Sequence, residues 1–383
     1  MRLLVNFTSL TKNGVIPIWL KKLQELSYQN CQIDFFFNNQ INKVDFGQKK
    51  LSQYNNSPKI KNLSQIKSKI KFIFYSLKKN LESIFTITKY IKNYDVFYSL
   101  SSVLDLVITP FFAKIYYPKI IWTTVFDNIV PITDPGNKIT RFLAWFFFQI
   151  SLVLICKADL IFTISPELRQ FLIDKHFDKN KIILTGNGIE IDLIKQAKRK
   201  NYLYDALYIG RINETKGIFD MLKVLKQIKK KYPKFTLAIM GDGDKTTKNK
   251  FKKQIKLMKL ESNIKYLGYI SGIQKFNIIK SSRCFWFLSV SQSESFGIAL
   301  MEAVSCGIPA FTYNLPTFTK IYRNKEVIFS PIHCPNIVAK KVLNLFNSKK
   351  FSNPNGKKLL GKYSWKNIAK IEIQAINKLI SNS

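Results

Sequence analysis

The feature that most constrains this chain is a repeated alternation of short apolar runs with helical patterns. In residues 1–200 the runs are Leu3–Phe7, Gln32–Phe37, Val96–Leu100, Lys119–Val125, Leu160–Ile164 and Lys181–Leu184. In residues 201–383 they are Ala206–Ile209, Thr236–Met240, Ile264–Leu267, Cys284–Ser289, Ala310–Tyr313 and Val327–Ser330. Strands that alternate with helices form parallel βαβ sheets, so the sequence predicts an α/β fold.

The two series of runs meet at a polar, basic stretch, Lys195–Asn201, which we expect to be a linker. A length of 383 residues likewise favours two domains of ordinary size over one. Because 46% of the residues are apolar, each domain can bury a core of its own. That fraction excludes a wholly disordered chain, which would have low hydrophobicity.

Charge is the second distinctive property of the chain. Its 61 lysines and arginines stand against 24 acidic residues, which gives a net charge of +37. A charge of this size favours anionic partners, namely nucleic acid, anionic lipid or phosphorylated substrates. A Lys-, Asn- and Ile-rich codon bias explains the excess equally well.

The few cysteines and histidines exclude two classes of site. Five widely spaced cysteines without a Cys-x-x-Cys pair fit reduced thiols in an intracellular protein better than a disulfide framework. The two histidines, His176 and His333, are too few for a His-rich metal site.

The longest apolar run, Phe142–Cys156, has 15 residues, whereas a membrane-spanning helix needs roughly 20. We therefore expect a buried core helix there, with a shallow membrane contact as the alternative. The N-terminal apolar run is too short for a signal peptide, so no secretion is predicted.

A basic, amphipathic stretch lies between Asp45 and Glu82, with nine lysines and no acid. These are Lys49, Lys50, Lys59, Lys61, Lys67, Lys69, Lys71, Lys78 and Lys79, and apolar residues interleave with the later ones. Such a stretch either lies on an anionic membrane or forms a solvated helix that packs its apolar face on the sheet. We predict peripheral attachment to the cytoplasmic membrane face through it.

The most informative stretch is residues 291–309, SQSESFGIALMEAVSCGIP, which follows an apolar strand. Gly297 opens a helix beyond the carboxyl end of that strand, where open parallel sheets bind ligands, and the free N–H groups of the helix suit a phosphate. Glu294 precedes the helix, and Glu302 lies five residues past Gly297, about 7–8 Å along the axis. Carboxylates so placed suit the hydroxyls of a ribose and of a transferred sugar. The alternative is an ordinary loop glutamate plus a helix glutamate.

This stretch resembles the Glu-x-x-x-x-x-x-x-Glu motif of retaining GT-B glycosyltransferases, specifically glycosyltransferase family 4 (glycosyl transferases group 1). The match consists of Glu294, Phe296-Gly297, Glu302-Ala303 and Gly307-x-Pro309. Further matches in the family's order are Ala158–Ser165, Asn187–Glu190, Ala206–Ile212 with Lys216-Gly217, Ile239–Gly243, Tyr266–Tyr269 and Tyr363–Trp365. The resemblance covers residues 155–383 well and residues 1–150 loosely.

The resemblance implies a GT-B fold, in which two Rossmann-like domains face each other across a cleft. We accordingly expect an acceptor-binding domain over residues 1–195, a nucleotide-sugar-binding domain over 202–362, and a C-terminal helix over 363–383 that crosses back to the first domain. The implied activity is that of a retaining hexosyltransferase, which moves a sugar from a nucleotide diphosphate to a hydroxyl acceptor such as a lipid-linked or cell-surface glycan precursor. We expect it to work in the cytoplasm, at the inner face of the cell membrane.

The resemblance also implies roles for individual residues. Arg211 and Lys216 would neutralise the donor diphosphate, which suits a leaving group that gains negative charge. Glu302 would bind the ribose and Glu294 the donor sugar. The implied donor-binding residues are Gly14, Gly210, Arg211, Lys216, Gly241, Asp242, Glu294, Ser295, Phe296, Gly297 and Glu302, and the implied catalytic ones are Glu294, Arg211, Lys216 and Asp127. Asp242-Gly-Asp244 has the form of a metal-binding Asp-x-Asp motif but matches a Gly-Asp-Gly turn of the family, so we expect loop architecture and no essential metal.

One position departs from the family pattern. Many relatives carry a His before an acid after the strand 119–125, whereas this chain has Phe126 before Asp127. Asp127 either contacts the sugar or acceptor, or caps a loop. Because the imidazole is missing, the alternative interpretation is that the chain is a catalytically weak relative that acts as a partner protein. A basic nucleic-acid-binding protein is the alternative from another class, and no zinc-finger spacing or RNA-binding aromatic motif supports it.

Overall fold

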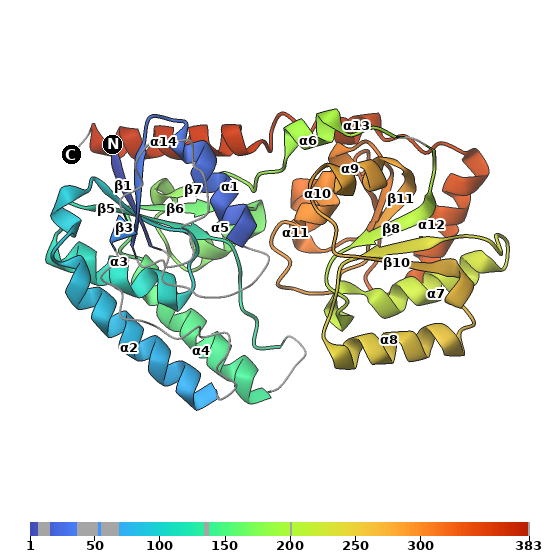
Figure 1. Ribbon diagram of the computed structural model, residues 1–383, viewed down its shortest axis with the longest axis horizontal. Helices are drawn as coiled ribbons and strands as arrows, with labels where there is room; N and C mark the ends of the chain where they lie inside the picture. Colours follow the sequence, from blue (N-terminus) through green and yellow to red (C-terminus); the bar gives the residue numbers. More distant parts are fainter. Residues whose placement is uncertain (7–15, 37–52, 55–68, 134–137, 200, 382–383) are drawn as a thin grey trace. The chain divides into compact units, whose positions relative to one another are not determined.

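The computed structural model describes residues 1–6, 16–36, 53–54, 69–133, 138–199 and 201–381. The chain divides into two compact units, residues 1–188 with 365–383, and residues 189–364. Each unit has helices on both faces of a parallel sheet (Figure 1). The predicted α/β class is therefore confirmed.

The described strands of the first unit form a parallel sheet in the order β3-β2-β1-β4-β5-β6-β7. They are β1 (Arg2–Asn6), β2 (Gln32–Phe36), β3 (Gln53–Tyr54), β4 (Val96–Ser99), β5 (Ile121–Phe126), β6 (Leu160–Thr163) and β7 (Ile182–Leu184). The helices are α1 (Ile16–Ser27), α2 (Lys69–Ile87), α3 (Leu104–Tyr116), α4 (Lys138–Ile155), α5 (Pro166–Asp174) and, from the end of the chain, α14 (Trp365–Ile380). Leu4 pairs with Asp34 on one side and Phe97 on the other, and the ring of Phe97 meets that of Phe36 edge to face in the core.

The second unit contains a parallel sheet in the order β10-β9-β8-β11-β12-β13. Its strands are β8 (Tyr204–Ile209), β9 (Leu237–Met240), β10 (Ile264–Gly268), β11 (Ser282–Phe287), β12 (Ala310–Tyr313) and β13 (Ile328–Ser330). Its helices are α6 (Ile191–Gln196), α7 (Ile218–Lys229), α8 (Lys245–Leu257), α9 (Gly272–Lys280), α10 (Ile298–Ser305), α11 (Pro316–Ile321), α12 (Pro335–Ser348) and α13 (Pro354–Lys357). Trp286 on β11 stacks on Phe235 at the centre of this core, with ring centroids 5.8 Å apart.

All twelve predicted strands are present, with ends shifted by at most two residues. The alternation of apolar runs with helical patterns was sufficient to predict these strands, because each run is buried in a parallel sheet and bounded by turns. The two-residue strand β3 was not predicted, because two residues carry no periodicity.

The last helix returns to the first unit, as predicted. Trp365 begins α14 and lies against Gly188, where an added Cβ would stand 2.1 Å from the indole. Glu372, fully buried in the middle of α14, accepts a hydrogen bond of 2.6 Å from the Tyr98 hydroxyl and pairs with Lys22 of α1 at 2.5 Å. These bonds fix the helix on the first unit, and the burial of Tyr98 beside a carboxylate raises its pKa.

The boundary between the units lies at residues 188 and 189, earlier than the expected 195. Helix α6 packs against α9 of the second unit. Just after α6, the backbone N–H of Lys198 donates to the Asn277 side chain at 2.9 Å, and Lys280 donates to the Ala197 carbonyl at 2.7 Å. Residues 189–198 therefore belong to the second unit rather than to the first or to a linker.

The expectation of a buried core helix over residues 142–156 is wrong for most of its length. Helix α4 buries Phe148, Ser151, Leu152 and Ile155, all in its C-terminal half. It is the one helix within the described ranges that is long and apolar enough to cross a membrane by length and composition, and 22% of it is buried.

Candidate active site

The strand order of the second sheet reverses between β8 and β11, because the chain moves outward to β9 and β10 and then returns to β11 on the other side of β8. The carboxyl ends of two such strands frame the usual ligand site of an open parallel sheet. Two loops lie there, residues 210–217 after β8 and residues 288–297 after β11. They are joined by a hydrogen bond of 2.9 Å from the Val290 N–H to the Thr215 carbonyl.

Gly217 allows the two loops to approach. It has φ +71°, and a Cβ at this position would lie 1.8 Å from the backbone oxygen of Leu288. Only a glycine fits a left-handed conformation against another backbone. The loop after β8 can therefore turn directly into α7 beside the loop after β11.

Lys216 and Glu294 face each other across these loops. Lys216 Nζ forms an ion pair with Glu294 Oε1, and the Ser289 hydroxyl lies 3.2 Å from the same oxygen. Burial, reinforced by the positive charge of Arg211, lowers the pKa of Lys216 to about 8. Arg211 is exposed, and its carbonyl accepts a 2.7 Å hydrogen bond from the Tyr208 hydroxyl. The structure thus brings three of the predicted residues, Arg211, Lys216 and Glu294, to one place.

The loop after β11 ends at the N-terminus of α10. Gly297 caps this helix in a left-handed conformation, φ +71°, and its carbonyl accepts from the Met301 N–H at 3.0 Å. Ser295 is partly exposed beside it, whereas Phe296 is buried against Tyr363 with ring centroids 5.3 Å apart. The first amide groups of α10 have no intrahelical acceptor, so this end of the helix suits an anion.

Glu302 lies further along α10 and is buried. It pairs with Lys275 of α9 at 2.6 Å. Burial raises the pKa of Glu302, and the nearby charge of Glu190 adds to the rise, whereas Lys275 opposes it. Glu302 is thus held separately from Glu294, which pairs with Lys216. Lys275 was not predicted, because one lysine among 61 basic residues carries no pattern of its own.

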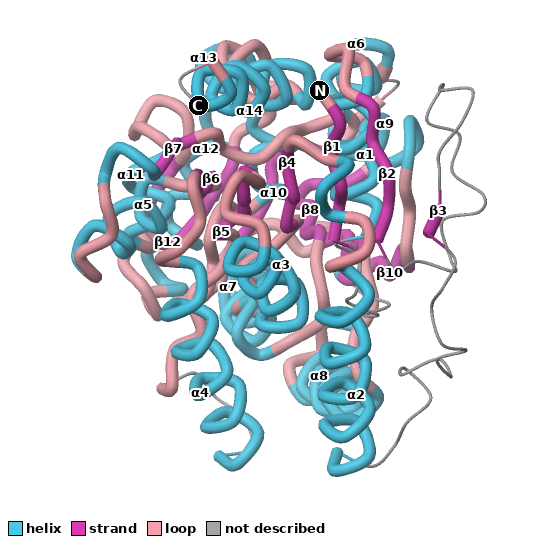
Figure 2. The backbone as a smooth tube through the Cα atoms, turned by 90° about the vertical axis from the view of Figure 1, so that its left-hand side faces the viewer, coloured by secondary structure: helices cyan, strands magenta, loops and turns pink. Residues whose placement is uncertain are grey.

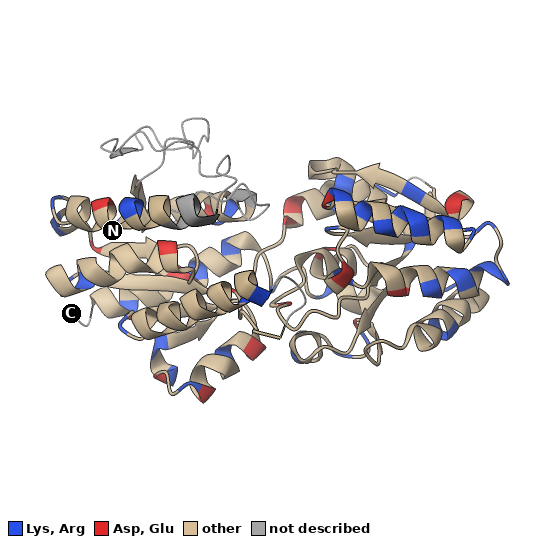
Figure 3. Cartoon of the chain, turned by 90° about the horizontal axis from the view of Figure 1, so that it is seen from below, with Lys and Arg blue, Asp and Glu red and all other residues tan. Residues whose placement is uncertain are grey.

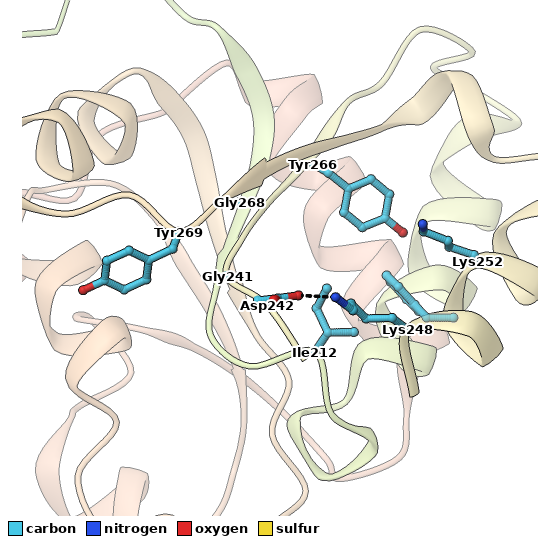
Figure 4. A pocket seen from close by; sticks show the side chains of 9 residues that line it. Ile212, Gly241, Asp242, Lys248, Lys252, Tyr266, Gly268 and Tyr269 are labelled. Atoms are coloured by element: carbon cyan, nitrogen blue, oxygen red, sulfur yellow. Dashed lines mark hydrogen bonds and ion pairs between the residues drawn. The ribbon is translucent and has the colours of Figure 1, made fainter. Parts of the chain in front are cut away.

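The turn after β9 contains Gly241 and Asp242, and it borders a cavity of about 460 Å³ (Figure 4). The lining residues are Ile212, Gly241, Asp242, Lys248, Phe251, Lys252, Tyr266, Gly268 and Tyr269. Tyr269 lies on one side of the turn, and Tyr266 lies near Lys252 on the other. The aromatic and cationic lining suits a flat or anionic group.

The Asp-x-Asp sequence at this turn has structural contacts. Asp242 pairs with Lys248 at 2.8 Å, and Asp244 accepts from the Thr247 N–H at 2.8 Å as the N-cap of α8. These hydrogen bonds lower the pKa of both carboxyls. The contacts fit the predicted loop architecture. Within the described part of the chain, no three His, Cys, Asp or Glu side chains are grouped as a metal site would require.

Asp127 follows β5 in the first unit and accepts a 2.7 Å hydrogen bond from the Ser101 hydroxyl. Burial raises its pKa to about 6, although the bond from Ser101 opposes the rise. Phe126, at the position where many relatives carry a His, points into the core and stacks on Phe171 with centroids 5.8 Å apart. Gly14, the remaining predicted residue, lies outside the described residues.

Comparison with known proteins finds a family whose model matches most of the second unit. Residues 190–357 match the family described as "Glycosyl transferases group 1". An uncharacterized glycosyltransferase of Methanocaldococcus jannaschii is 32% identical over 174 residues, which cover 42% of this chain and 41% of that protein. A phosphatidyl-myo-inositol mannosyltransferase of Mycobacterium tuberculosis is 26% identical over 159 residues, 40% of each chain. The chain thus spans less than half of the length of these two relatives.

A likeness to a solved structure extends over the whole chain. The Anabaena protein HepE, crystallised with UDP and glucose, aligns over 100% of both chains with a TM-score of 0.71 at 14% identity. At this identity the likeness shows the fold alone. Together with the two parallel sheets and the return of α14, it confirms the predicted GT-B fold.

Proposed function

Because residues 190–357 match the glycosyl transferases group 1 family, we propose that the protein transfers a hexose from a nucleoside-diphosphate sugar to a hydroxyl acceptor. The matched region contains the whole candidate site of the second unit, from Glu190 to Glu302. The M. tuberculosis relative is a mannosyltransferase by name, and HepE was solved with UDP and glucose, which supports a donor of this class.

The observation that carries the proposal is the convergence of Arg211, Lys216 and Glu294 at the switch point of the second sheet. A diphosphate leaving group gains negative charge as the glycosidic bond breaks. Two cations in a partly buried site stabilise that charge more than the ground state, which is how such residues accelerate transfer. The N-terminus of α10 adds backbone donors to the same anion.

The two glutamates divide the remaining groups of the donor between them. Glu302, inside α10 and paired with Lys275, is assigned to the ribose hydroxyls. Glu294, in the loop before the helix, is assigned to the hydroxyls of the transferred sugar. Its pairing with Lys216 places the sugar ligand beside the cation that holds the distal phosphate.

We infer retention of the anomeric configuration from the resemblance to retaining family members. In such enzymes the leaving phosphate assists the attack of the acceptor on the same face of the sugar, so no protein nucleophile is required. The acceptor is proposed to be a lipid-linked or cell-surface glycan precursor, and the site of action the cytoplasmic face of the membrane.

A panel of UDP-, GDP- and ADP-linked hexoses in a thermal-shift assay tests donor binding, because a ligand that binds the folded state raises its apparent stability. One nucleotide series is expected to raise Tm in the native protein and to have little effect on Lys216→Ala. With the donor identified, proton NMR of the product should show the anomeric configuration of the donor. No shift with any nucleotide sugar would contradict the proposal.

The burial of Phe126 favours a second candidate, a catalytically weak relative that acts as a partner protein. No imidazole can act at that position. A turnover assay distinguishes the two candidates, because the weak relative would bind a nucleotide sugar without hydrolysing or transferring it.

A further inference from the structure

Helix α2 buries polar side chains and exposes apolar ones, which is the reverse of what a surface helix of a water-soluble unit usually does. Among its described side chains, residues 74–87, the buried ones are mostly polar and include Lys79, Asn80 and Ser83. Its outward stripe contains Phe74 and Phe85, which are 64% and 74% exposed. A surface helix usually buries its apolar stripe and turns charged residues to water, so this arrangement calls for an apolar medium outside.

The polar side of α2 is fixed by Asp105 of α3. Asp105 accepts hydrogen bonds from Ser76 at 2.6 Å and from Asn80 at 2.9 Å, and it pairs with Lys79 at 3.3 Å. Rotating the helix to bury its phenylalanines would break all three contacts. The outward direction of the apolar stripe is therefore set by specific bonds.

Helix α4 likewise turns apolar side chains outward, although the side chains that it buries are mostly apolar as well. Helix α3 packs against both α2 and α4, and Figure 2 shows these two helices on either side of it. Phe142 and Phe146 form a stacked pair on the outward side of α4, with Val153 two turns further along. The N-terminal half of the helix has no buried side chain. We call the outward side chains Phe74, Leu81, Phe85, Phe142, Phe146 and Val153 the apolar face.

The exposed charges at the two ends of α4 are positive. They belong to Lys138 and Lys157, and residues 138–157 contain no acid. On α2, Lys78 is 62% exposed in the outward stripe and pairs with Glu82 at 3.9 Å, so the basic flanks of the face come from α4. Figure 3 looks onto this side of the first unit, and its helices are mostly uncharged there. An apolar strip with basic flanks is the pattern that anionic lipid surfaces attract.

We propose that the apolar face lies on an anionic lipid bilayer, with the aromatic rings of α4 inserted below the headgroups and the flanking lysines among them. A second copy of this chain fits less well, because two molecules that each carry +37 repel. The helix lies along the bilayer rather than across it, because Phe148, Leu152 and Ile155 hold its C-terminal half on the unit. This inference does not depend on the proposed donor site.

The inference narrows the predicted attachment through residues 49–79, which stays a prediction. Within that stretch, Lys79 is buried against Asp105 and is not available to lipid. Lys49, Lys50, Lys59, Lys61 and Lys67 lie outside the described residues. The proposed contact keeps Phe74 and Lys78 of that stretch and adds the outward side chains of α4.

The test is co-sedimentation of the full chain with vesicles of phosphatidylglycerol in phosphatidylcholine. Native protein should bind, and binding should fall with added salt and with less anionic lipid. Phe142→Ser/Phe146→Ser should lower the partition coefficient roughly tenfold or more. The matched control is Leu203→Ser/Leu257→Ser, which removes two exposed leucines of the second unit and should bind like the native protein. Trp145 of α4 has its ring centroid 6.0 Å from that of Phe142, so brominated lipid should quench the tryptophan fluorescence of native protein more than that of Trp145→Phe.

The affinity of the serine variants for a nucleoside diphosphate is measured as well. This affinity should equal that of native protein whether or not lipid binding is lost, so a failure of the lipid proposal can be told apart from a failure of the proposed function. Native protein that ignores anionic vesicles at low salt would overturn the inference. So would serine variants that bind vesicles as tightly as the control, which would leave a purely electrostatic contact. A native dimer that the Phe142 and Phe146 changes convert to monomer would likewise assign the face to a second copy.

Discussion

Lys216 and Glu294, 78 residues apart in the chain, form an ion pair at the switch point of the second sheet. The pair joins the turn before α7 to the loop before α10, so it connects the two segments assigned to the donor diphosphate and sugar. Without donor, each side chain neutralises the other. A bound diphosphate would share the ammonium of Lys216, while the sugar hydroxyls would donate to the Glu294 carboxylate.

Removing either cation of the site should slow transfer. In Arg211→Ala and Lys216→Ala, the lost contacts to the diphosphate are each expected to contribute about 2–4 kcal/mol to the transition state. Steady-state assays should therefore show kcat/KM lower by roughly 30- to 1,000-fold. Lys340→Ala, which removes an exposed lysine from α12, is the control and should act normally. Near-normal turnover in both site variants would remove the proposed donor site.

Donor binding should depend on pH through Lys216. Burial lowers the pKa of this lysine to about 8. The ammonium form that attracts a diphosphate predominates below that pH and is lost as pH rises through it. The affinity for a nucleoside diphosphate should accordingly fall in this range, whereas Lys216→Arg should retain its affinity because a guanidinium stays protonated. A native profile that matches the arginine variant would show that Lys216 does not touch the phosphates.

Asp127 should make stability depend on pH in the acidic range. Its folded pKa of about 6 lies above the unfolded value, near 4, so folding favours the protonated carboxyl. The contribution of Asp127 to the free energy of unfolding is complete below about pH 4 and is lost as pH rises towards 6. The total loss is about 2–3 kcal/mol. Urea unfolding should show the decline in native protein relative to Asp127→Asn. A constant difference between the two proteins from about pH 4 to 7 would contradict the shifted pKa.

The sequence predicted every described strand of the two sheets except β3, because each of the others is a short buried run between turns. It also located Glu294, Gly297 and Glu302, because a glycine at a helix start and two spaced carboxylates form a local pattern. The structure adds the pairing of Lys216 with Glu294, which depends on how two distant loops meet. No local pattern encodes such a contact.

Other features could not be predicted from the sequence for the same physical reason. Helical periodicity shows that α2 has an apolar stripe, but not that Asp105 of another helix turns that stripe outward. The length of the apolar run in α4 favoured a core helix, whereas only 22% of this helix is buried. The unit boundary moved to residue 188 because α6 packs on α9, a contact that composition does not indicate.

The most direct test of the account is calorimetric titration of a nucleoside diphosphate into native protein, Glu302→Ala and Glu294→Ala. In the proposed donor site, Glu302 binds the ribose and Glu294 binds the transferred sugar. Glu302→Ala should therefore weaken binding by roughly 1.5–3 kcal/mol, a loss of about 10- to 150-fold, through the lost hydrogen bonds of a charged group. Glu294→Ala should bind the nucleoside diphosphate at least as tightly as native protein, because Lys216 is then free for the phosphates, while sugar transfer is lost. Equal losses of affinity in both variants, or no loss in Glu302→Ala, would contradict the assignment of this site to a nucleotide-sugar donor.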